Sequence, residues 1–296
     1  MEFGKPEIGQ LERTDFTLPP EPSFNAATFK MVKKGNQPVY VGCAKWGRKE
    51  WIGKIYPKGI KEKDFLAEYG KHYNSIELNA TNYKFYKKED LAGWAGQMTN
   101  PQFKFCPKAH KGLNFLATSE QKGRLSDDFI VSLTGFGEML GPVFFLIDQR
   151  HDPVKLEQFF TYLRSLPKDI SFFVGMRNAD FYANKVLTTS FFETLREIGI
   201  GSVITDVLGR SDVLHMHLSI PKAFIRFVGN SLHPSDYKRI DNWVDKIKFW
   251  LGKGIEEIYF FMHMHDEATS PELSRYLVDQ LNKKCSLGFK EVQFVT

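Results

Sequence analysis

Eight short apolar segments with the character of β-strands recur along the chain, and segments with helical periodicity lie between most of them. The strand candidates are residues 39–43, 75–79, 103–108, 143–148, 170–176, 202–206, 224–229 and 257–262. The helix candidates are residues 62–72, 88–98, 126–140, 153–165, 188–198, 235–252 and 271–284. Strands that alternate with helices predict a parallel sheet, and eight strands are the number that closes a TIM barrel. We therefore expect an α/β fold, a TIM-barrel-like (β/α)8 closed parallel barrel, whose helix between the sixth and seventh strands is missing or irregular.

An open doubly wound sheet with an extra domain is the alternative architecture. Such a sheet ordinarily carries a glycine-rich phosphate-binding motif after its first strand, and neither GxGxxG nor GxxxxGK[ST] occurs here. The polar, proline-containing leader differs from the rest of the chain. We expect residues 1–36 to form an N-terminal extension that is a surface arm or partly disordered, and residues 37–296 to form a single TIM-barrel-like domain.

Composition narrows the class of protein. The net charge of +5 weakly favours an anionic partner and is too small for a dedicated nucleic-acid tail. Three cysteines without a CxxC pair favour a reducing compartment over a disulfide framework. No signal-peptide pattern and no apolar run of roughly 18 residues are present, so we expect a cytoplasmic protein with no membrane partner. The sequence carries no signal for a particular oligomeric state.

Three stretches within residues 41–113 carry a dense, ordered motif, namely VGCAKWGRKEWIGKIYP, YNSIELNATNYKFYKKEDLAGWA and FKFCPKAHKGL. They resemble the opening of the domain of unknown function 72 family, called YecE-like. The matching positions are Gly42, Trp46, Trp51, Tyr56, Pro57, Glu77, Asn79, Asn82, Tyr83, Trp94, Phe103, Phe105 and Lys108. The resemblance implies a TIM-barrel-like fold and supplies no reaction.

Beyond residue 110 the resemblance is thinner, which indicates a divergent member. Where the family usually has Glu-x-Arg on its fifth strand, this chain keeps Arg177 but has Gly175. Where the seventh strand usually reads Arg-x-His-Gly, Arg226 is kept and Val228 replaces the histidine. The eighth strand offers His263 instead of the usual asparagine pair.

Polar residues follow several of the predicted strands, and TIM barrels carry their active sites at the carboxyl ends of the strands. Strand alternation puts Glu77 and Asn79 on one face. In a barrel, Glu77 would share a cavity with Lys108, Arg177 and Arg226, where the carboxylate is held ionised and the cations bind an anionic ligand. The alternative is a structural ion pair of Glu77 with one of these cations. We predict that Glu77 and Lys108 are catalytic. The predicted substrate-binding residues are Trp46, Asn79, Tyr83, Arg177, Arg226 and Asn230.

The basic, aromatic first loop has two interpretations. A surface for stacking on a sugar or base, with Lys45, Arg48 and Lys49 nearby for phosphate groups, is offered by Trp46, Trp51, Tyr56, Tyr83 and Tyr86. The alternative is packing of the loop, which we expect for Trp51 and Tyr56, whereas Trp46 is expected to line the site.

Two His-x-His patterns, at residues 215–217 and 263–265, raise the question of a metal. No HExxH motif is present, so we predict no cofactor and keep a divalent metal as an alternative. Its candidate ligands are His263, His265 and Asp206, with Asp148 as an alternative to Asp206.

Three hypotheses of function follow. The first is an enzyme that acts on a small anionic or phosphorylated substrate by acid/base or hydrolytic chemistry at the carboxyl ends of the strands. The second is a non-catalytic protein that binds nucleic acid or a nucleotide through its first loop. The third is a metal-dependent phosphodiesterase.

Overall fold

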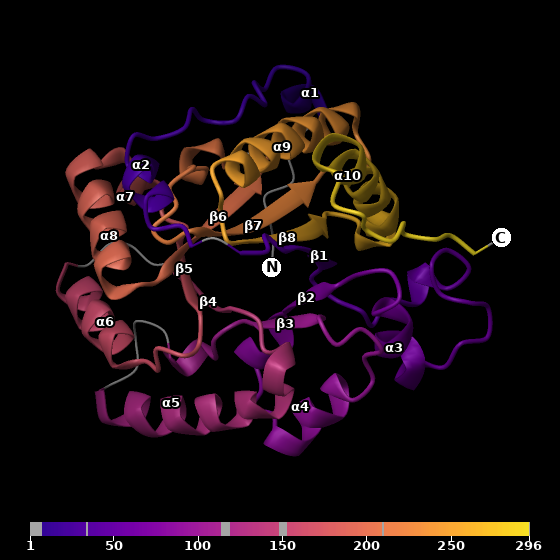
Figure 1. The fold of residues 1–296 in the computed structure, drawn as a ribbon, viewed down its shortest axis with the longest axis horizontal. Helices are drawn as coiled ribbons and strands as arrows, with labels where there is room; N and C mark the ends of the chain where they lie inside the picture. Colours follow the sequence, from indigo (N-terminus) through magenta and orange to yellow (C-terminus); the bar gives the residue numbers. More distant parts are fainter. Residues whose placement is uncertain (1–7, 34, 114–118, 148–152, 209, 296) are drawn as a thin grey trace.

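Parallel strands with helices around them make up the fold (Figure 1), seen in a computed structural model that describes residues 8–33, 35–113, 119–147, 153–208 and 210–295. The strands are β1 (Val39–Cys43), β2 (Ser75–Leu78), β3 (Lys104–Pro107), β4 (Val143–Ile147), β5 (Phe172–Met176), β6 (Gly201–Val207), β7 (Lys222–Gly229) and β8 (Glu257–Met264). Six of them form a sheet in the order β1-β8-β7-β6-β5-β4, and β2 pairs with β3. Every pairing is parallel. The prediction of an α/β fold with eight parallel strands is confirmed.

Helices lie on the outside of the strands (Figure 1). Those with eight or more residues are α4 (Lys88–Ala95), α5 (Ser119–Leu133), α6 (Pro153–Ser165), α8 (Lys185–Ile198), α9 (Pro234–Gly252) and α10 (Ser270–Cys285). The shorter ones are α1 (Ile8–Leu11), α2 (Asn25–Phe29), α3 (Phe65–Tyr69) and α7 (Ala179–Ala183). Between β6 and β7 the described residues contain only a 3-10 turn, Ser211–Val213, which agrees with the missing helix that we expected there. No helix in the described ranges is long and apolar enough to cross a membrane.

Side chains, rather than a backbone ladder, join β1 to β2. The Tyr69 hydroxyl accepts a hydrogen bond from the Cys43 N–H (2.7 Å) and donates one to the Ser75 carbonyl (2.8 Å). Asn74 likewise contacts β1 through its side chain. A side chain at position 42 would clash with the Ser75 carbonyl, which explains the glycine there. Because no ladder pairs β1 with β2 in the described chain, closure of the predicted barrel is not shown.

Isolated parallel bridges join the other pair of sheet edges. Phe105 on β3 bridges to Leu140, and Lys108, which directly follows β3, bridges to Phe144 on β4. The Ala109 N–H donates to the Phe144 carbonyl (2.8 Å). The two sheets are therefore neighbours at both edges, although the contacts there are few.

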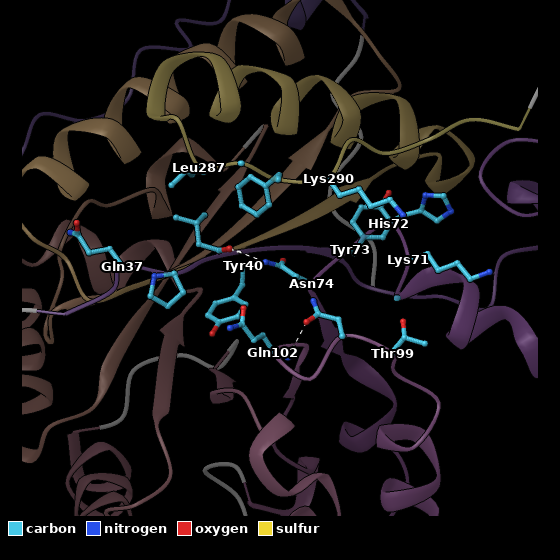
Figure 2. A pocket seen from close by; sticks show the side chains of 16 residues that line it. Gln37, Tyr40, Lys71, His72, Tyr73, Asn74, Thr99, Gln102, Leu287 and Lys290 are labelled. Carbon is cyan, nitrogen blue, oxygen red and sulfur yellow. Dashed lines mark hydrogen bonds between the residues drawn. The ribbon is translucent and has the colours of Figure 1, made fainter.

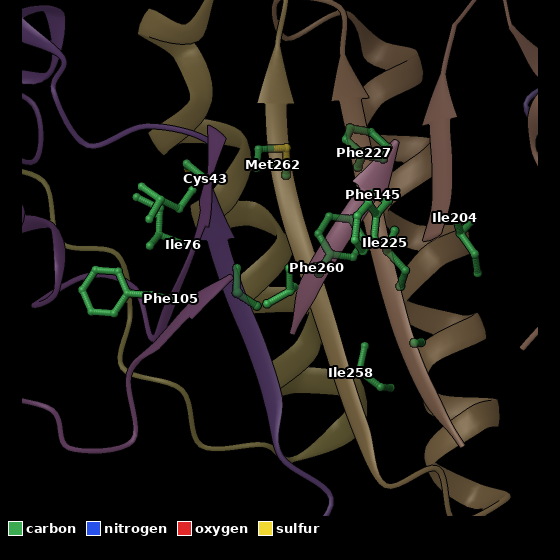
Figure 3. Packing of buried hydrophobic residues seen from close by; sticks show 14 of the residues in the cluster. Cys43, Ile76, Phe105, Phe145, Ile204, Ile225, Phe227, Ile258, Phe260 and Met262 are labelled. Atoms are coloured by element: carbon green, nitrogen blue, oxygen red, sulfur yellow. The ribbon is translucent and has the colours of Figure 1, made fainter. Parts of the chain in front are cut away.

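Apolar side chains pack on both faces of the strands, as strand alternation requires. The larger cluster lies between strands and helices, and Figure 3 shows part of it, with Ile76, Phe145 and Phe260 labelled. A second, separate cluster consists of Tyr40, Cys106, Phe144, Leu146, Phe173, Val203, Ile220, Phe224, Tyr259 and Phe261. Its members come from seven of the strands and from Ile220 just before β7, so this face is filled with side chains as in a barrel interior.

Buried polar contacts fix the described part of the N-terminal extension against the rest of the chain. Asn25 on α2 is fully buried; it donates to the Met216 carbonyl (2.7 Å) and accepts from the Leu218 N–H (2.8 Å). The Glu21 carboxylate accepts from Lys246 on α9 (3.0 Å). Residues 8–33 thus lie as an arm along the outside of the fold (Figure 1).

The first His-x-His pattern packs beside this arm. His215 is buried; its Nε2 lies 3.2 Å from the Val203 carbonyl oxygen, and its Nδ1 accepts from the His217 N–H (3.2 Å). Both nitrogens therefore suit a neutral ring. The His217 ring stacks on Phe192 with 4.2 Å between the centroids. Burial, with a smaller contribution from His217, lowers the pKa of His215 to about 3.

This burial predicts that the protein loses stability in acid. The unfolded chain protonates His215 near pH 6.5, whereas the folded chain protonates it only near its lowered pKa of about 3. The contribution of neutral His215 to stability is therefore complete above pH 6.5 and is lost as the pH falls toward 3. At pH 4.5 the loss in the free energy of unfolding is on the order of 3 kcal/mol. Urea unfolding at pH 7.5 and pH 4.5 measures the loss, and His215→Gln should reduce it. An equal loss in the two proteins would contradict the account.

Candidate functional site

Three side chains from strands and one that directly follows a strand meet in a buried, charged cluster, which we call the Glu77 cluster: Glu77, Asn79, Arg226 and His263. Arg226 donates two parallel hydrogen bonds to the Glu77 carboxylate, from Nε to Oε2 (2.8 Å) and from a terminal nitrogen to Oε1 (2.9 Å). His263 Nε2 lies 3.0 Å from Glu77 Oε2, and the Asn79 amide donates to Oε1 (2.8 Å). Glu77 and Arg226 are fully buried and His263 is 3% exposed.

The strands place these side chains at one end of the fold. Glu77 is the third residue of the four in β2, and Asn79 follows that strand directly. Arg226 and His263 lie in the carboxyl-terminal halves of the neighbouring strands β7 and β8. Because β1 and β8 stand between β2 and β7 in the strand arrangement, contact between Glu77 and Arg226 requires both side chains to face the same interior.

The cluster keeps Glu77 ionised. Burial alone would raise the pKa of the Glu77 carboxyl, but the Arg226 guanidinium, His263 and their hydrogen bonds together outweigh burial and hold that pKa well below its usual value. A carboxylate of this kind is a weak base at neutral pH. A carboxylate in this state is suited to orienting and stabilising its neighbours.

The distances assign the tautomer of His263. Its Nε2 lies 3.0 Å from the Glu77 carboxylate, which can only accept a hydrogen bond, and 3.4 Å from a terminal nitrogen of Arg226, which can only donate one. The shorter of the two contacts is the one to the acceptor. We therefore place the proton on Nε2, where it is donated to Glu77. With the proton there, Nδ1 is the ring nitrogen with acceptor character, as in a histidine that a carboxylate orients.

The other predicted charged residues lie at the same end of the strands. Lys108 directly follows β3 and is buried; its carbonyl accepts from the Thr81 hydroxyl (2.8 Å). Arg177 directly follows β5 and is half-buried. Asn230 directly follows β7, and its amide donates to Asp236 (3.1 Å). The structure thus brings Glu77, Asn79, Arg226 and His263 into contact and puts Lys108, Arg177 and Asn230 at neighbouring strand ends.

The suggested metal ligands are not brought together. Asp206 on β6 accepts from Arg239 (2.7 Å) and from the Trp243 indole (2.8 Å), both on α9, so it faces the helices and not the Glu77 cluster. The sequence-based choice overlooked strand alternation, which turns Asp206 away from the face that His263 occupies. Asp148 lies outside the described residues. Among the residues that are described, no group of three or more His, Cys, Asp or Glu could hold a metal ion.

Two aromatic residues of the first loop, Trp51 and Tyr56, pack in the core as expected. Trp51 and Tyr56 are fully buried; the Trp51 indole donates to the Glu267 carbonyl (2.9 Å), and the Tyr56 hydroxyl donates to the Trp46 carbonyl (2.8 Å). Trp46 itself is half-buried and contacts Trp94 edge-on at 5.2 Å between centroids. Tyr83, by contrast, is 62% exposed.

Three cavities lined by described residues lie at the opposite end of the strands. One has a volume of about 510 Å³ and is lined by residues that include Tyr40, Asn74 and Lys290 (Figure 2). The second, of about 470 Å³, shares Tyr40 and includes Lys222, the first residue of β7. The third, of about 560 Å³, also shares Tyr40. None of the three is lined by the Glu77 cluster. In TIM barrels the amino-terminal end of the strands serves stability and the carboxyl-terminal end carries the chemistry.

The fold and site define an α/β protein of eight parallel strands with a carboxylate, a guanidinium and an imidazole in contact at the carboxyl ends of the strands. The family model described as protein of unknown function DUF72 matches residues 40–292, so this chain belongs to that family. The prediction from the three sequence stretches is thereby confirmed.

Relatives and solved structures agree with this membership. The UPF0759 protein YecE of Escherichia coli, in strains O157:H7 and K12, is 24% identical over 263 residues, which cover 83% of this chain and 93% of the relative. A crystal structure of a DUF72 family protein from Enterococcus faecalis V583 superposes with a TM-score of 0.69 at 14% identity, covering 88% of this chain and 99% of that one. A second crystal structure of that protein gives a TM-score of 0.62. At this identity the likeness shows the fold.

Proposed function

We propose that this chain is an enzyme that acts on a small anionic or phosphorylated substrate by acid/base chemistry, at the carboxyl ends of the strands of a TIM-barrel-like scaffold. One observation carries the proposal: His263 contacts a buried carboxylate that a bidentate arginine keeps ionised. Burying three such groups costs desolvation energy that well-packed apolar residues would avoid. Titratable groups with strongly perturbed pKa values concentrate at functional sites.

The roles follow from the contacts. His263 is the proton-transfer group, Glu77 positions it and stabilises its protonated form, and Arg226 keeps Glu77 ionised. Lys108 and Arg177, at the ends of β3 and β5, are the cations that face the anionic group of the substrate. The lining residues in this proposal are Trp46, Asn79, Tyr83 and Asn230.

In the proposed step, His263 Nδ1 takes a proton from the substrate and the ring becomes an imidazolium. The Glu77 carboxylate, 3.0 Å from Nε2, stabilises that positive charge. The negative charge that develops on the substrate is matched by the cations at the strand ends. Return of the proton to another atom of the substrate, or to a leaving group, completes the cycle.

A search for turnover tests the proposal. The protein is incubated in D2O with sugar phosphates, nucleoside monophosphates and phosphorylated carboxylic acids, while ¹H spectra report exchange at carbon and ³¹P spectra report release of phosphate. We expect turnover of at least one class, which His263→Gln removes and His72→Gln, at the opposite end of the strands, retains. No change in any compound, or equal turnover in both variants, would contradict the proposal.

A further inference from the structure

A row of aromatic side chains lies on the loops that follow β1 and β2 and on helix α4, at the same end of the fold as the Glu77 cluster. We call it the aromatic row; it consists of Trp46, Tyr83, Tyr86 and Trp94. Trp94 is at its centre, with ring centroids 5.2 Å from Trp46 and 4.8 Å from Tyr86. Tyr83 precedes Tyr86 by three residues and follows the 3-10 turn Asn79–Asn82, which leads directly out of β2.

One ring of the row is exposed, and the other three pack partly against the core, which holds them in place before any ligand binds. Tyr83 is 62% exposed, and Trp46, Tyr86 and Trp94 are half-buried. The Trp46 carbonyl accepts from the hydroxyl of the fully buried Tyr56, so the base of the row is anchored in the core. Rings that are already held against the core lose little entropy on binding, and Tyr83 offers an exposed face beside them.

The chain segment that carries the row is rich in positive charge. Residues 41–113 contain 14 Lys and Arg but only 7 Asp and Glu, whereas the whole chain has a net charge of +5. The remainder of the chain is therefore slightly acidic. Lys45, Lys84, Lys87 and Lys88 are exposed beside the row, and Lys84 Nζ lies 5.1 Å from the centre of the Tyr86 ring.

We propose that the aromatic row binds single-stranded nucleic acid, with unpaired bases stacked on its rings and phosphates beside its lysines. Neutral glycans would use the rings but not the excess of positive charge, and duplex DNA would use the charge but keep its bases inside the helix. Rings interleaved with cations suit a single strand, because every base offers a face for stacking. The inference goes beyond the proposed function, because binding here requires neither Arg226 nor His263.

Fluorescence anisotropy with a labelled twelve-residue oligothymidylate tests the inference. Tyr83→Ala should weaken binding ~5- to 150-fold, the loss typical of one stacked base. Phe249→Ala is the matched control: this ring, 41% exposed on α9, also has two lysines over it, Lys246 and Lys253, but lies outside the row. The affinity of the Phe249→Ala variant for the oligothymidylate should equal that of the wild type.

Salt and competitor measurements complete the experiment. If four lysines contact phosphates, raising the salt from 50 to 200 mM should weaken binding about 50-fold, and Lys84→Glu with Lys87→Glu should reduce that dependence. His263→Gln should bind the oligonucleotide as the wild type does, so failure of the proposed chemistry and failure of this inference give different results. No binding at 50 mM salt, equal losses for Tyr83→Ala and Phe249→Ala, or equal affinity for duplex DNA would overturn the inference.

Discussion

Replacement of Arg226 by Met should lower the free energy of unfolding by about 3–5 kcal/mol, because it leaves a buried carboxylate without its cation. Arg226 and Glu77 are both fully buried and share two hydrogen bonds of 2.8 and 2.9 Å. Methionine retains much of the aliphatic length of arginine, so the loss reports the charge more than the packing. Urea unfolding at pH 7, followed by tryptophan fluorescence and circular dichroism, measures it.

The double variant Arg226→Met with Glu77→Gln is the matched control. Removing the carboxylate charge as well should recover most of the lost stability, since no uncompensated ion remains. Lowering the pH should reduce the difference in the free energy of unfolding between the single variant and the wild type. The folded wild type keeps Glu77 ionised far into the acid range because the pKa of its carboxyl is held low, whereas in the single variant the carboxyl can protonate. A loss below 1 kcal/mol in the single variant would contradict the buried ion pair.

Replacement of His263 by Gln should reduce kcat for the substrate found by the NMR search by about 10²- to 10⁴-fold, the usual contribution of a general base. Glutamine can still donate a hydrogen bond toward Glu77 but cannot take up a proton. We expect KM to change less than kcat, because the cations at the strand ends, Lys108 and Arg177, bind the substrate. Steady-state kinetics at several pH values separate the two parameters.

Two further variants make this prediction specific. Glu77→Gln should lose less activity than His263→Gln, since Glu77 acts through the histidine, and it should change the pH dependence of kcat. His72→Gln, at the other end of the strands, should leave both parameters unchanged. If His263→Gln keeps full activity while Glu77→Gln loses it, the proton-transfer role belongs to the carboxylate instead.

Strand periodicity explains why so much of the fold could be predicted. The first strand was expected at residues 39–43 and is observed as Val39–Cys43, since a buried parallel strand is an apolar run between polar loops. Alternation also put Glu77 and Asn79 on one face, where their side chains now contact each other. These inferences needed only spacing within one strand.

Inferences that depend on spatial neighbours were less successful. The sequence suggests His263 only as a polar residue at a strand end or as a metal ligand, because its contact with Glu77 depends on which strands approach β2. Asp206 was chosen for its place near a strand end, and its contact with Trp243 shows that it faces α9. Alternation along β6 puts Asp206 on the opposite face from Thr205 and Val207. The rule that grouped Glu77 with Asn79 could therefore have excluded Asp206 as a metal ligand.

Contacts made by single side chains could not be predicted at all. Tyr69 joins β1 to β2 through one hydroxyl, and Asn25 fixes the N-terminal arm through one amide. Neither residue has a sequence neighbourhood that marks it, because each partner lies on a distant segment. Such contacts follow from the tertiary structure and not from periodicity.

The position of a bound anion tests the central claim, that the functional site lies at the carboxyl ends of the strands. Crystals grown with sodium tungstate would show the anion by anomalous scattering. The account predicts a peak within contact distance of Lys108 and Arg177, on the side of the Glu77 cluster. A peak confined to the cavities around Tyr40 at the amino ends, with nothing beside Lys108 and Arg177, would contradict it.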